Sequence, residues 1–381
     1  MIPYGHHDID DDDVAAVEAV LRGEWLTTGP AVTEFETDLR TWTGDVPVVA
    51  VSSGTAALHV AYAAAGVGSG DEVITPPMTF IATQATAVAR GATIVFADVC
   101  ADTANIDPAA VEAAVTARTK AIVAVDYAGH PADMDALRVI ADRHGLLLIE
   151  DAAHSLGSTY RGRAVGSLAD ITAFSFFPTK NITTAEGGAV AVRDPERLLR
   201  AREFARQGLI RDPARHRVAD QGPWHQEVQS FGLNYRLPDV LAALGSQQLR
   251  RLAGFKARRA EIKAAHDAIY EGVPALEIPV QRDDVDPIWH LYPLRVPADR
   301  RREVFERLRA SGIGVQVNYL PAYWHPVFAD LGYPRGLCPV AEDFYAREIS
   351  MPMFTSLTDK EIQVVADALV ATIDGPSKGR R

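Results

Sequence analysis

The sequence predicts an α/β fold, in which a largely parallel sheet is covered by helices. Short runs of apolar and β-branched residues alternate with helical stretches from residue 45 to about residue 195. These runs are almost continuously apolar, which is typical of strands buried on both faces of a sheet. The strands are expected at Val48–Val51, Glu72–Thr75, Thr93–Phe96, Ala121–Val125 and Leu146–Ile149. Parallel strands need crossover helices, so this alternation predicts layers of helix and sheet.

Helices are expected between and after these strands. Glycine is favoured just beyond the end of a helix, and Gly91 and Gly145 stand where two helices should end. The acidic run Asp10–Asp13 is expected to be a solvated cap, because negative charge is favourable at a helix N-terminus. The expected helices are Val14–Leu21, Ala56–Ala65, one opening at Pro108–Glu112, Ala132–His144, Pro195–Arg206 and a long one from Pro238 to about Tyr270.

The pattern changes near residue 275. The segment Ile278–Val296 is broken by several Pro and Asp residues, and it leads into a mixture of helix and strand. We expect a helix at Arg301–Ala310, a short strand at Gly314–Tyr319 and a closing helix at Asp359–Ile373. The sequence therefore predicts an N-terminal arm and a large domain over residues 1–255, followed by a smaller α+β domain over residues 256–381.

Composition and charge narrow the class of protein. With 381 residues, 48% hydrophobic and 23% charged, the chain can bury a large core and is neither disordered nor fibrous. Its 38 Lys and Arg against 50 Asp and Glu give a net charge of −12, which disfavours nucleic acid as a partner. The two cysteines are far apart and match no metal or disulfide spacing. The N-terminus lacks signal-peptide features and no apolar run reaches about 18 residues, so we expect a cytoplasmic protein without membrane segments.

Two motifs that resemble other kinds of binding site have a simpler structural explanation. Gly66–Gly70 contains glycines at a spacing similar to a dinucleotide loop, but it follows a helix and precedes a strand, which is the wrong context. His6, His7 and Asp8 could ligate a metal, but no further ligands follow at metal-site spacing. We therefore expect no nicotinamide site and no metal site.

The most informative residues are an acid at the end of a strand and a lysine 29 positions later. Asp151 closes the apolar run Leu147–Ile149, and the carboxyl ends of parallel strands are where such sheets bind ligands. Lys180 follows a strand-like aromatic run, and Phe174, Phe176, Phe177 and Ile182 around it should desolvate its amine. Desolvation lowers the pKa of a lysine, which suits it to form a Schiff base. Pyridoxal 5′-phosphate (PLP) chemistry needs such a lysine and a carboxylate for the ring nitrogen.

A third element is the strand-to-helix junction Ser52–Leu58. Its small and hydroxyl residues precede a helix whose N-terminal N–H groups can hold a phosphate. Simple capping by Ser53 or Thr55 is an equally good explanation of this motif on its own. The Ser175 hydroxyl, on the strand before Lys180, is placed to bind the same phosphate.

Together these motifs resemble the DegT/DnrJ/EryC1/StrS sugar aminotransferases over nearly the whole chain. The resemblance is carried by Ser52–Leu58, Pro77–Thr83, Ile149–Ser155, Phe176–Gly188 and Gly232–Arg236. Within the family, Val125–Gly129, Ile182–Gly188 and Ala341–Tyr345 are most similar to the transaminases that make UDP-4-amino-4,6-dideoxy-N-acetyl-altrosamine. The resemblance implies PLP fold type I, with a three-layer αβα large domain that binds PLP and a smaller α+β C-terminal domain.

The resemblance also implies a role for each site residue. Lys180 would carry the Schiff base and move the proton, Asp151 would pair with the pyridinium nitrogen, and His154 would lie near the ring hydroxyl. Phe80 would stack on the ring, while the phosphate would be held by Gly54, Thr55, Ser175 and, from a neighbouring subunit, Asn234. The nucleotide-sugar contacts map onto Tyr4, Glu24, Trp25, Leu26, Thr27, Gln316, Val317, Asn318 and Tyr319. A homodimer with shared active sites follows from the role of Asn234.

The expected function is ping-pong transfer of an amino group from glutamate to a nucleotide-linked 4-keto-6-deoxy (N-acetylamino) sugar. Some family members replace the lysine with histidine and dehydrate their substrate, whereas this chain keeps Lys180. Two alternatives stay open. One is another keto sugar or cyclitol of an antibiotic or secondary-metabolite pathway, and the other is a non-catalytic, PLP-bound regulatory protein.

Overall fold

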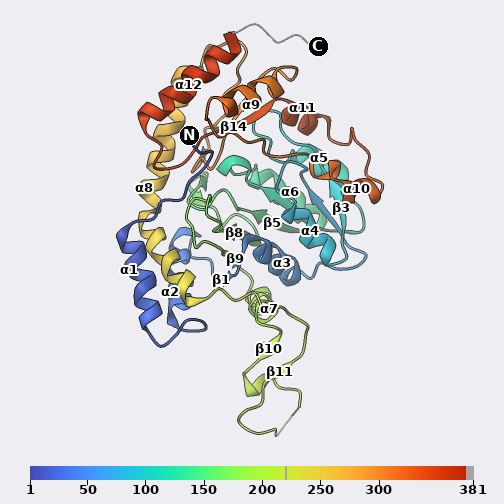
Figure 1. The fold of residues 1–381 in the computed structure, drawn as a ribbon. Helices are drawn as coiled ribbons and strands as arrows, with labels where there is room; N and C mark the ends of the chain where they lie inside the picture. The colour runs from blue at the N-terminus through green and yellow to red at the C-terminus, as the bar shows by residue number, and fades with distance from the viewer. Residues whose placement is uncertain (219–220, 375–381) are drawn as a thin grey trace.

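The computed structural model describes residues 1–218 and 221–374, and a seven-stranded sheet forms its centre (Figure 1). The strand order is β1-β9-β8-β5-β4-β2-β3. Only β9 runs antiparallel to its neighbours β1 and β8, so the prediction of a largely parallel sheet is confirmed. The strands are β1 (Val48–Val51), β2 (Glu72–Thr75), β3 (Thr93–Phe96), β4 (Thr119–Val125), β5 (Leu147–Asp151), β8 (Ile171–Ser175) and β9 (Gly188–Val192).

Helices cover both faces of the sheet because alternate residues of each strand point to opposite sides. Val49 and Val51 of β1 face one apolar core, and Val48 and Ala50 face the other. The first core is closed by α3 (Gly54–Ala64), α4 (Ala82–Ala89) and α7 (Pro195–Ala205). The second is closed by α2 (Pro30–Trp42), α5 (Pro108–Ala114), α6 (Met134–His144) and α8 (Asp239–Tyr270). These three layers confirm the expected large-domain architecture.

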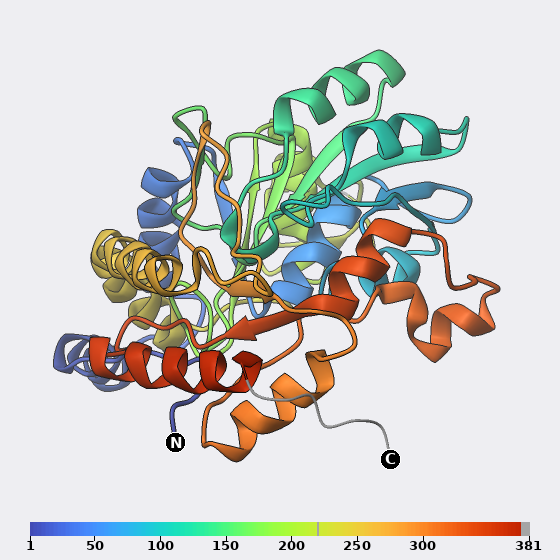
Figure 2. The same cartoon turned by 90° about the horizontal axis from the view of Figure 1, so that it is seen from above.

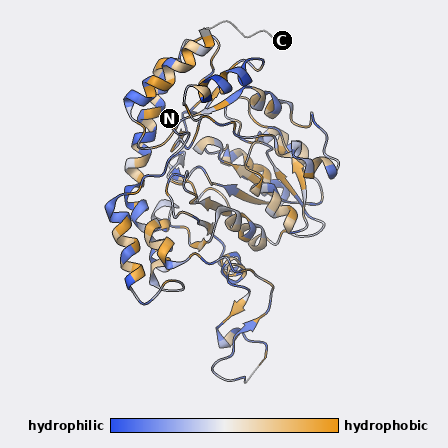
Figure 3. Cartoon of the chain, viewed as in Figure 1, coloured by the Kyte–Doolittle hydropathy of each residue, from blue (hydrophilic) through white to orange (hydrophobic). Residues whose placement is uncertain are grey.

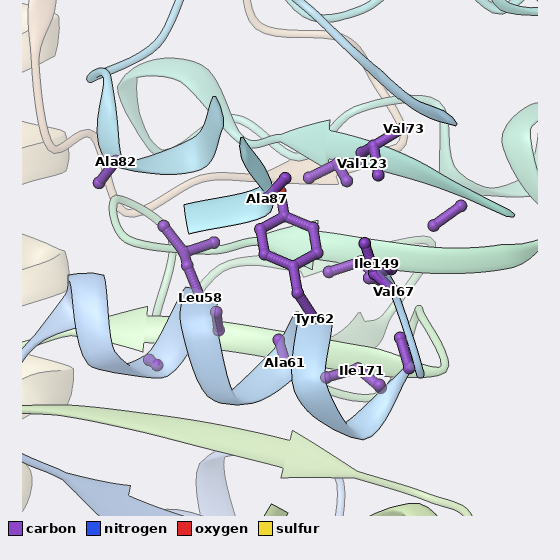
Figure 4. Packing of buried hydrophobic residues seen from close by; sticks show 14 of the residues in the cluster. Leu58, Ala61, Tyr62, Val67, Val73, Ala82, Ala87, Val123, Ile149 and Ile171 are labelled. Carbon is purple, nitrogen blue, oxygen red and sulfur yellow. The ribbon is translucent and has the colours of Figure 1, made fainter. Parts of the chain in front are cut away.

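The first core shows how the sheet and α3 fix each other. Tyr62 of α3 is fully buried, and Figure 4 shows its ring among small and branched side chains that include Ile149 of β5. Its hydroxyl still needs a partner in this apolar setting, and it donates to the Thr83 carbonyl of α4 at 2.7 Å. Tyr62 therefore ties α3 to the start of α4.

The N-terminal helix corrects one expectation about the acidic run. Helix α1 (Asp11–Arg22) begins with a capping box between Asp10 and Asp13. Asp13 is fully buried rather than solvated, because its carboxylate accepts hydrogen bonds from Gln248 at 2.7 Å and Arg251 at 2.8 Å of α8. Part of the acidic cap thus attaches α1 to α8.

A third apolar core lies in the C-terminal part of the chain. It is built by β13 (Tyr292–Arg295), β14 (Glu348–Met351), α9 (Arg301–Ala310) and α12 (Asp359–Asp374), and it also includes Ile2 from the N-terminus. Figure 2 shows α9, α12 and β14 lying together beside the main sheet. The predicted domain boundary at residues 255 and 256 falls inside α8, which runs continuously between the two regions.

The strand predicted at Gly314–Tyr319 is wrong. This segment forms an isolated bridge from Gln316 to Ser350, and a second bridge, from Ile313 to Ile2, lies just before it. The Gly314 N–H donates to the Ile2 carbonyl at 2.7 Å, so the N-terminal segment occupies a backbone group that a β-ladder would use.

Several short elements connect the larger ones. They are β6 (Thr159–Tyr160), β7 (Arg163–Ala164), β12 (Val285–Asp286), α10 (Pro326–Asp330), α11 (Pro339–Arg347) and the 3₁₀ turns Tyr127–Gly129, Pro213–Arg215 and Ala322–Trp324.

A slender arm projects from the body after α7 (Figure 1). It carries the short pair β10 (Leu209–Ile210) and β11 (Glu227–Val228). Two large apolar side chains on it are open to solvent, Trp224 at 79% and Phe231 at 97% of their area. Elsewhere the outer helices α1 and α12 show both hydrophilic and hydrophobic residues along their length, as amphipathic helices do (Figure 3). Among the described helices, none combines the length and apolar character needed to cross a bilayer.

Candidate active site

A cavity of about 540 Å³ opens at the carboxyl ends of three parallel strands. Val125, Asp151 and Ser175 line it, and they are the last residues of β4, β5 and β8. This is the edge where open α/β sheets place their ligand crevices. Its opposite wall comes from the C-terminal part of the chain, so the cavity lies between the two predicted domains.

Lys180 lies in the turn after β8 and its side chain lines the cavity. Burial lowers the pKa of its amine to about 8, and the nearby Asp151 carboxylate opposes that change. Of the four apolar residues expected to desolvate it, Phe174 and Phe177 line the same cavity. Phe174, Phe176 and Ile182 also belong to the second core, so the amine lies between that core and the cavity.

Asp151 is buried at the floor of the cavity and is held from two sides. Its Oδ2 accepts a hydrogen bond from the Thr83 hydroxyl at 2.6 Å, and its Oδ1 accepts one from the Ala153 N–H at 3.2 Å. Burial raises the pKa of Asp151, while these two hydrogen bonds and the charge of Lys180 counteract the rise. Since Thr83 is also bonded through its carbonyl to Tyr62, the apolar core positions the carboxylate.

His154 lines the same cavity as Lys180, and its ring lies against a second imidazole. The rings of His154 and His290 are 4.2 Å apart between centroids, and His154 Nε2 lies 3.2 Å from the Tyr319 hydroxyl. Burial and the charge of Lys180 hold the pKa of both imidazoles well below the usual value, so both are neutral at physiological pH. The pair supplies hydrogen-bonding groups to the cavity without adding charge.

The expected phosphate cradle is assembled at the N-terminus of α3. Ser53 caps the helix by accepting the Ala56 N–H at 3.0 Å, and the N–H groups of Gly54 and Thr55 precede that one in the first turn. A Cβ on Gly54 would lie 2.7 Å from the Ser175 hydroxyl, so only glycine lets the helix approach β8 this closely. The structure thus brings Gly54, Thr55 and Ser175 to one end of the cavity.

The C-terminal part of the chain, together with Tyr4 from the N-terminus, contributes an aromatic and amide wall. Tyr4, Gln316, Asn318 and Tyr319 line the cavity, as the sequence predicts for substrate contacts. Phe80 also lines it, with its ring 6.4 Å from that of Tyr319 and 60% of its area exposed.

Other predicted site residues lie outside the cavity of their own chain. Asn234 stands at the base of the arm, where its backbone bridges to Arg206. Val317 is next to lining residues but is not one of them. The turn formed by Glu24, Trp25, Leu26 and Thr27 is exposed on the surface after α1.

Thr79, Thr83 and His290 line the cavity although the sequence did not predict them as site residues. Thr79 and Thr83 fall within the motif Pro77–Thr83, so the hydroxyls of that motif were a usable signal. His290 stands in a stretch expected to be irregular, and nothing in its sequence neighbourhood distinguishes it from a core histidine. In residues 1–218 and 221–374, no group of three or more His, Cys, Asp or Glu could hold a metal ion.

The residues present fit PLP. The cavity offers a desolvated amine, a buried carboxylate and a helix N-terminus beside a hydroxyl, which match the aldehyde, the ring nitrogen and the phosphate of that molecule. The close approach of Gly54 to Ser175 gives the phosphate end a narrow cradle that a side chain would fill.

Comparison with known proteins gives the same result. The sequence pattern of the DegT/DnrJ/EryC1/StrS aminotransferase family matches residues 7–370. The spore coat polysaccharide biosynthesis protein SpsC of Bacillus subtilis is 39% identical, with 98% of each chain covered. The putative sugar aminotransferase Spr1654 of Streptococcus pneumoniae, in its PMP form, superposes with a TM-score of 0.93 at 30% identity over 98% of this chain and 99% of that one.

Helicobacter pylori PseC, an aminotransferase involved in pseudaminic acid biosynthesis, superposes with a TM-score of 0.91 at 33% identity, again over 98% and 99% of the two chains. These matches extend over the arm, the sheet and the C-terminal region alike. The chain therefore belongs to the DegT/DnrJ/EryC1/StrS aminotransferase family and is a PLP-dependent sugar aminotransferase of fold type I.

Proposed function

We propose that this protein transfers an amino group from glutamate to a nucleotide-linked 4-keto-6-deoxy sugar, in its N-acetylamino form. The observation that carries the proposal is the buried Lys180 amine, which shares a cavity of about 540 Å³ with Asp151. That volume is in the range of small-molecule sites and has room for a sugar beside the cofactor. The similarity to SpsC and PseC supports a sugar that is destined for a surface polysaccharide or for a pseudaminic-acid-like product.

The chemistry is divided between the cofactor and the chain. When bound, PLP supplies the electron sink that makes a proton on the carbon beside the amine acidic. Asp151 is placed to keep the ring nitrogen protonated, because it is a buried carboxylate held by Thr83 and Ala153. Lys180 has a pKa of about 8, so its amine can take up and return a proton near neutral pH. Donor and sugar reach Lys180 through the same cavity, which supports ping-pong turnover.

The remaining cofactor contacts follow from the walls of the cavity. In this proposal Gly54, Thr55 and Ser175 hold the phosphate, Phe80 covers a ring face and His154 lies near the ring hydroxyl. All five residues line the cavity, which supports these roles. We propose that Asn234 completes the phosphate site from a second copy of the chain. Its distance from its own cavity and the exposed Trp224 and Phe231 on the arm support a homodimer with shared sites.

For the sugar nucleotide we propose contacts with Tyr4, Gln316, Asn318 and Tyr319, which line the wall opposite the sheet. Val317 and the exposed turn Glu24–Thr27 would join the site through bound substrate or through the second copy. We also propose a cytoplasmic location, which is supported by two free cysteines, Cys100 and Cys338.

A substrate panel tests this function. The purified protein should absorb in the visible region with PLP bound, and glutamate should bleach that band. UDP-linked 4-keto-6-deoxy-N-acetylamino sugars should then restore it faster than keto sugars without a nucleotide or keto cyclitols. Faster restoration by a cyclitol would overturn the proposed substrate, and faster bleaching by glutamine would overturn the proposed donor. No bleaching by any donor would favour the regulatory alternative.

A pair of lysine variants tests the assignment of the catalyst. Lys180→Ala should lose bleaching by glutamate. Lys360→Ala, a change at an exposed lysine of α12, should leave it unchanged. Full turnover by Lys180→Ala would show that another residue moves the proton.

A further inference from the structure

The N-terminal segment holds Tyr4 in the wall of the active site from both sides. The Ile2 N–H donates to the Gly312 carbonyl at 2.9 Å, and the Gly314 N–H donates to the Ile2 carbonyl at 2.7 Å. On the far side the Met353 N–H donates to the Tyr4 carbonyl at 3.3 Å. The Tyr4 backbone is therefore clamped between two segments of the C-terminal region, and its ring lines the cavity.

The Tyr4 hydroxyl is the end of a chain of buried hydrogen bonds, which we name the Tyr4 relay (Tyr4, Asn318, Ser350 and Glu348). The Asn318 Nδ2 group donates one hydrogen to the Tyr4 hydroxyl oxygen at 2.6 Å and another to Ser350 Oγ at 3.0 Å. Ser350 is in turn bonded to Glu348 Oε1. Asn318, Ser350 and Glu348 are buried, so these bonds are shielded from water.

Asn318 has little freedom to reorient. Its N–H donates to Glu348 Oε2 at 2.8 Å, and its carbonyl accepts the Tyr127 hydroxyl. Both backbone groups of Asn318 are thus occupied by buried partners. The amide is fixed in a position where Tyr4 and Ser350 both receive its hydrogens.

The direction of these bonds decides what Tyr4 offers to the cavity. A tyrosine hydroxyl has one proton to donate and lone pairs that accept. Because Asn318 donates to the oxygen of Tyr4, the Tyr4 proton is not used by the amide. Burial raises the pKa of Glu348 to about 8, so at neutral pH its protonated form donates to Ser350, whose own proton can then turn toward the Tyr4 oxygen. Because Asn318 and Ser350 then both donate to that oxygen, the Tyr4 proton is left for a partner in the cavity.

We infer that Asn318 and Ser350, anchored by Glu348, are positioning residues that make Tyr4 a hydrogen-bond donor to an oxygen of the acceptor substrate. The inference rests on the proposed function, in which Tyr4 contacts the sugar. It also predicts which chemical groups of the substrate Tyr4 can bind. The group opposite Tyr4 must accept a hydrogen bond, as a carbonyl, hydroxyl or carboxylate oxygen does, whereas an ammonium group has no lone pair to offer. Ser350 acts on the substrate only through Tyr4.

A double-mutant cycle tests this dependence, with a UDP-linked 4-keto-6-deoxy-N-acetylamino sugar as the probe. Ser350→Ala should lower kcat/KM for the sugar about three- to tenfold, the size of one neutral hydrogen bond. It should leave the rate at which glutamate bleaches the visible band unchanged. In a Tyr4→Phe background, Ser350→Ala should have no further effect, because the hydroxyl that it positions is gone.

The matched control is Ser246→Ala, which removes a buried hydroxyl in α8 that has no hydrogen-bond partner among the described residues. It should change neither half-reaction. An equal effect of Ser350→Ala with and without the Tyr4 hydroxyl would overturn the inference. An equal loss in the glutamate half-reaction would do the same, since it would indicate general damage to the site.

A second measurement does not depend on the sugar. In the PLP-bound protein labelled with 3-fluorotyrosine, the ¹⁹F signal of Tyr4 is identified by its loss in Tyr4→Phe. Ser350→Ala should shift that signal and Ser246→Ala should not. An unmoved Tyr4 signal in Ser350→Ala would refute the relay. If the signal moves but the probe sugar is not aminated by the wild-type protein, the relay stands and the proposed sugar is wrong.

Discussion

Lys180 shows how one residue's surroundings prepare it for chemistry. Exposed lysines are protonated at neutral pH, whereas burial in this cavity lowers the pKa of Lys180 to about 8. The opposing charge of Asp151 keeps the pKa from falling further. The amine is therefore available both as a nucleophile and as a proton carrier within the physiological range.

This pKa predicts how the PLP-free protein takes up its cofactor. Only the neutral amine can attack the aldehyde, so the uptake rate should fall about tenfold for each pH unit below 8. Above pH 8 the rate should level off, because the amine is already deprotonated. Stopped-flow absorbance of the PLP-free protein mixed with PLP measures this profile. A rate that still climbs at pH 10 would show that Lys180 behaves as an exposed lysine.

Thr83 makes a second prediction at the scale of one residue. Its hydroxyl stabilises the charged form of Asp151, so Thr83→Val should raise the pKa of Asp151 further. The neutral acid cannot hold the ring nitrogen protonated. The glutamate half-reaction at pH 7 should then slow about tenfold, the size of a hydrogen bond to a charged group. Thr83→Ser keeps the hydroxyl and should retain the wild-type rate. Equal rates in the two variants would show that the hydrogen bond is dispensable.

At the scale of the element, helix α8 links the N-terminal helices to the C-terminal region. It packs against α1, α2 and α12, and it runs through the residue at which the sequence suggested a domain boundary. Two glycines within it have opposite surroundings. Gly254 faces open space, whereas a Cβ on Gly245 would lie 2.5 Å from the Phe35 ring and 2.8 Å from the Thr184 methyl group.

This contrast predicts opposite effects of the same substitution. Gly254→Ala should raise the free energy of unfolding by about 0.5–1 kcal/mol, because alanine loses less backbone entropy in a helix. Gly245→Ala should lower it by about 1–3 kcal/mol, because the added methyl group overpacks the contact with α2. Urea unfolding of both variants measures the change. If both were stabilising, the α2–α8 contact would have to be looser than the structure shows.

At the scale of the whole molecule, the site is divided among distant parts of the chain. The sheet supplies the amine and the carboxylate, the C-terminal region supplies the opposite wall, and the N-terminus supplies Tyr4. Asn234 stays outside the cavity of its own chain. In the proposed dimer, Asn234 of each chain would reach the site of the other chain, since a two-fold axis brings the same arm to both sites.

A complementation experiment tests the shared site. Lys180→Ala and Asn234→Ala should each lose most activity alone. In a mixed dimer, one site would carry both defects and the other neither, so the hybrid should regain about half of the wild-type activity. Activity of separately purified variants, mixed after dissociation and reassociation, gives the measurement. No recovery in a confirmed mixed dimer would place Asn234 in the site of its own chain.

Much of the fold and the centre of the site could be predicted because they depend on local signals. The strands β1, β2 and β3 have the predicted bounds, since fully buried strands leave continuous apolar runs. The strand prediction at Gly314–Tyr319 was wrong because the β-like composition of this segment does not show that the N-terminal segment hydrogen-bonds to it. His290 could not be predicted because nothing in its sequence neighbourhood shows that the fold brings its ring against His154.

The sequence by itself determined the α/β layering, the family and the residue types at the centre, because patterns of burial and the order of motifs are written along the chain. Only the tertiary structure decided how these groups meet. It placed Thr83 within hydrogen-bonding distance of Asp151, His290 against His154, and Tyr4 beside Asn318, which is 314 positions away in the sequence. Distances of that kind depend on packing between distant segments, and no local pattern records them.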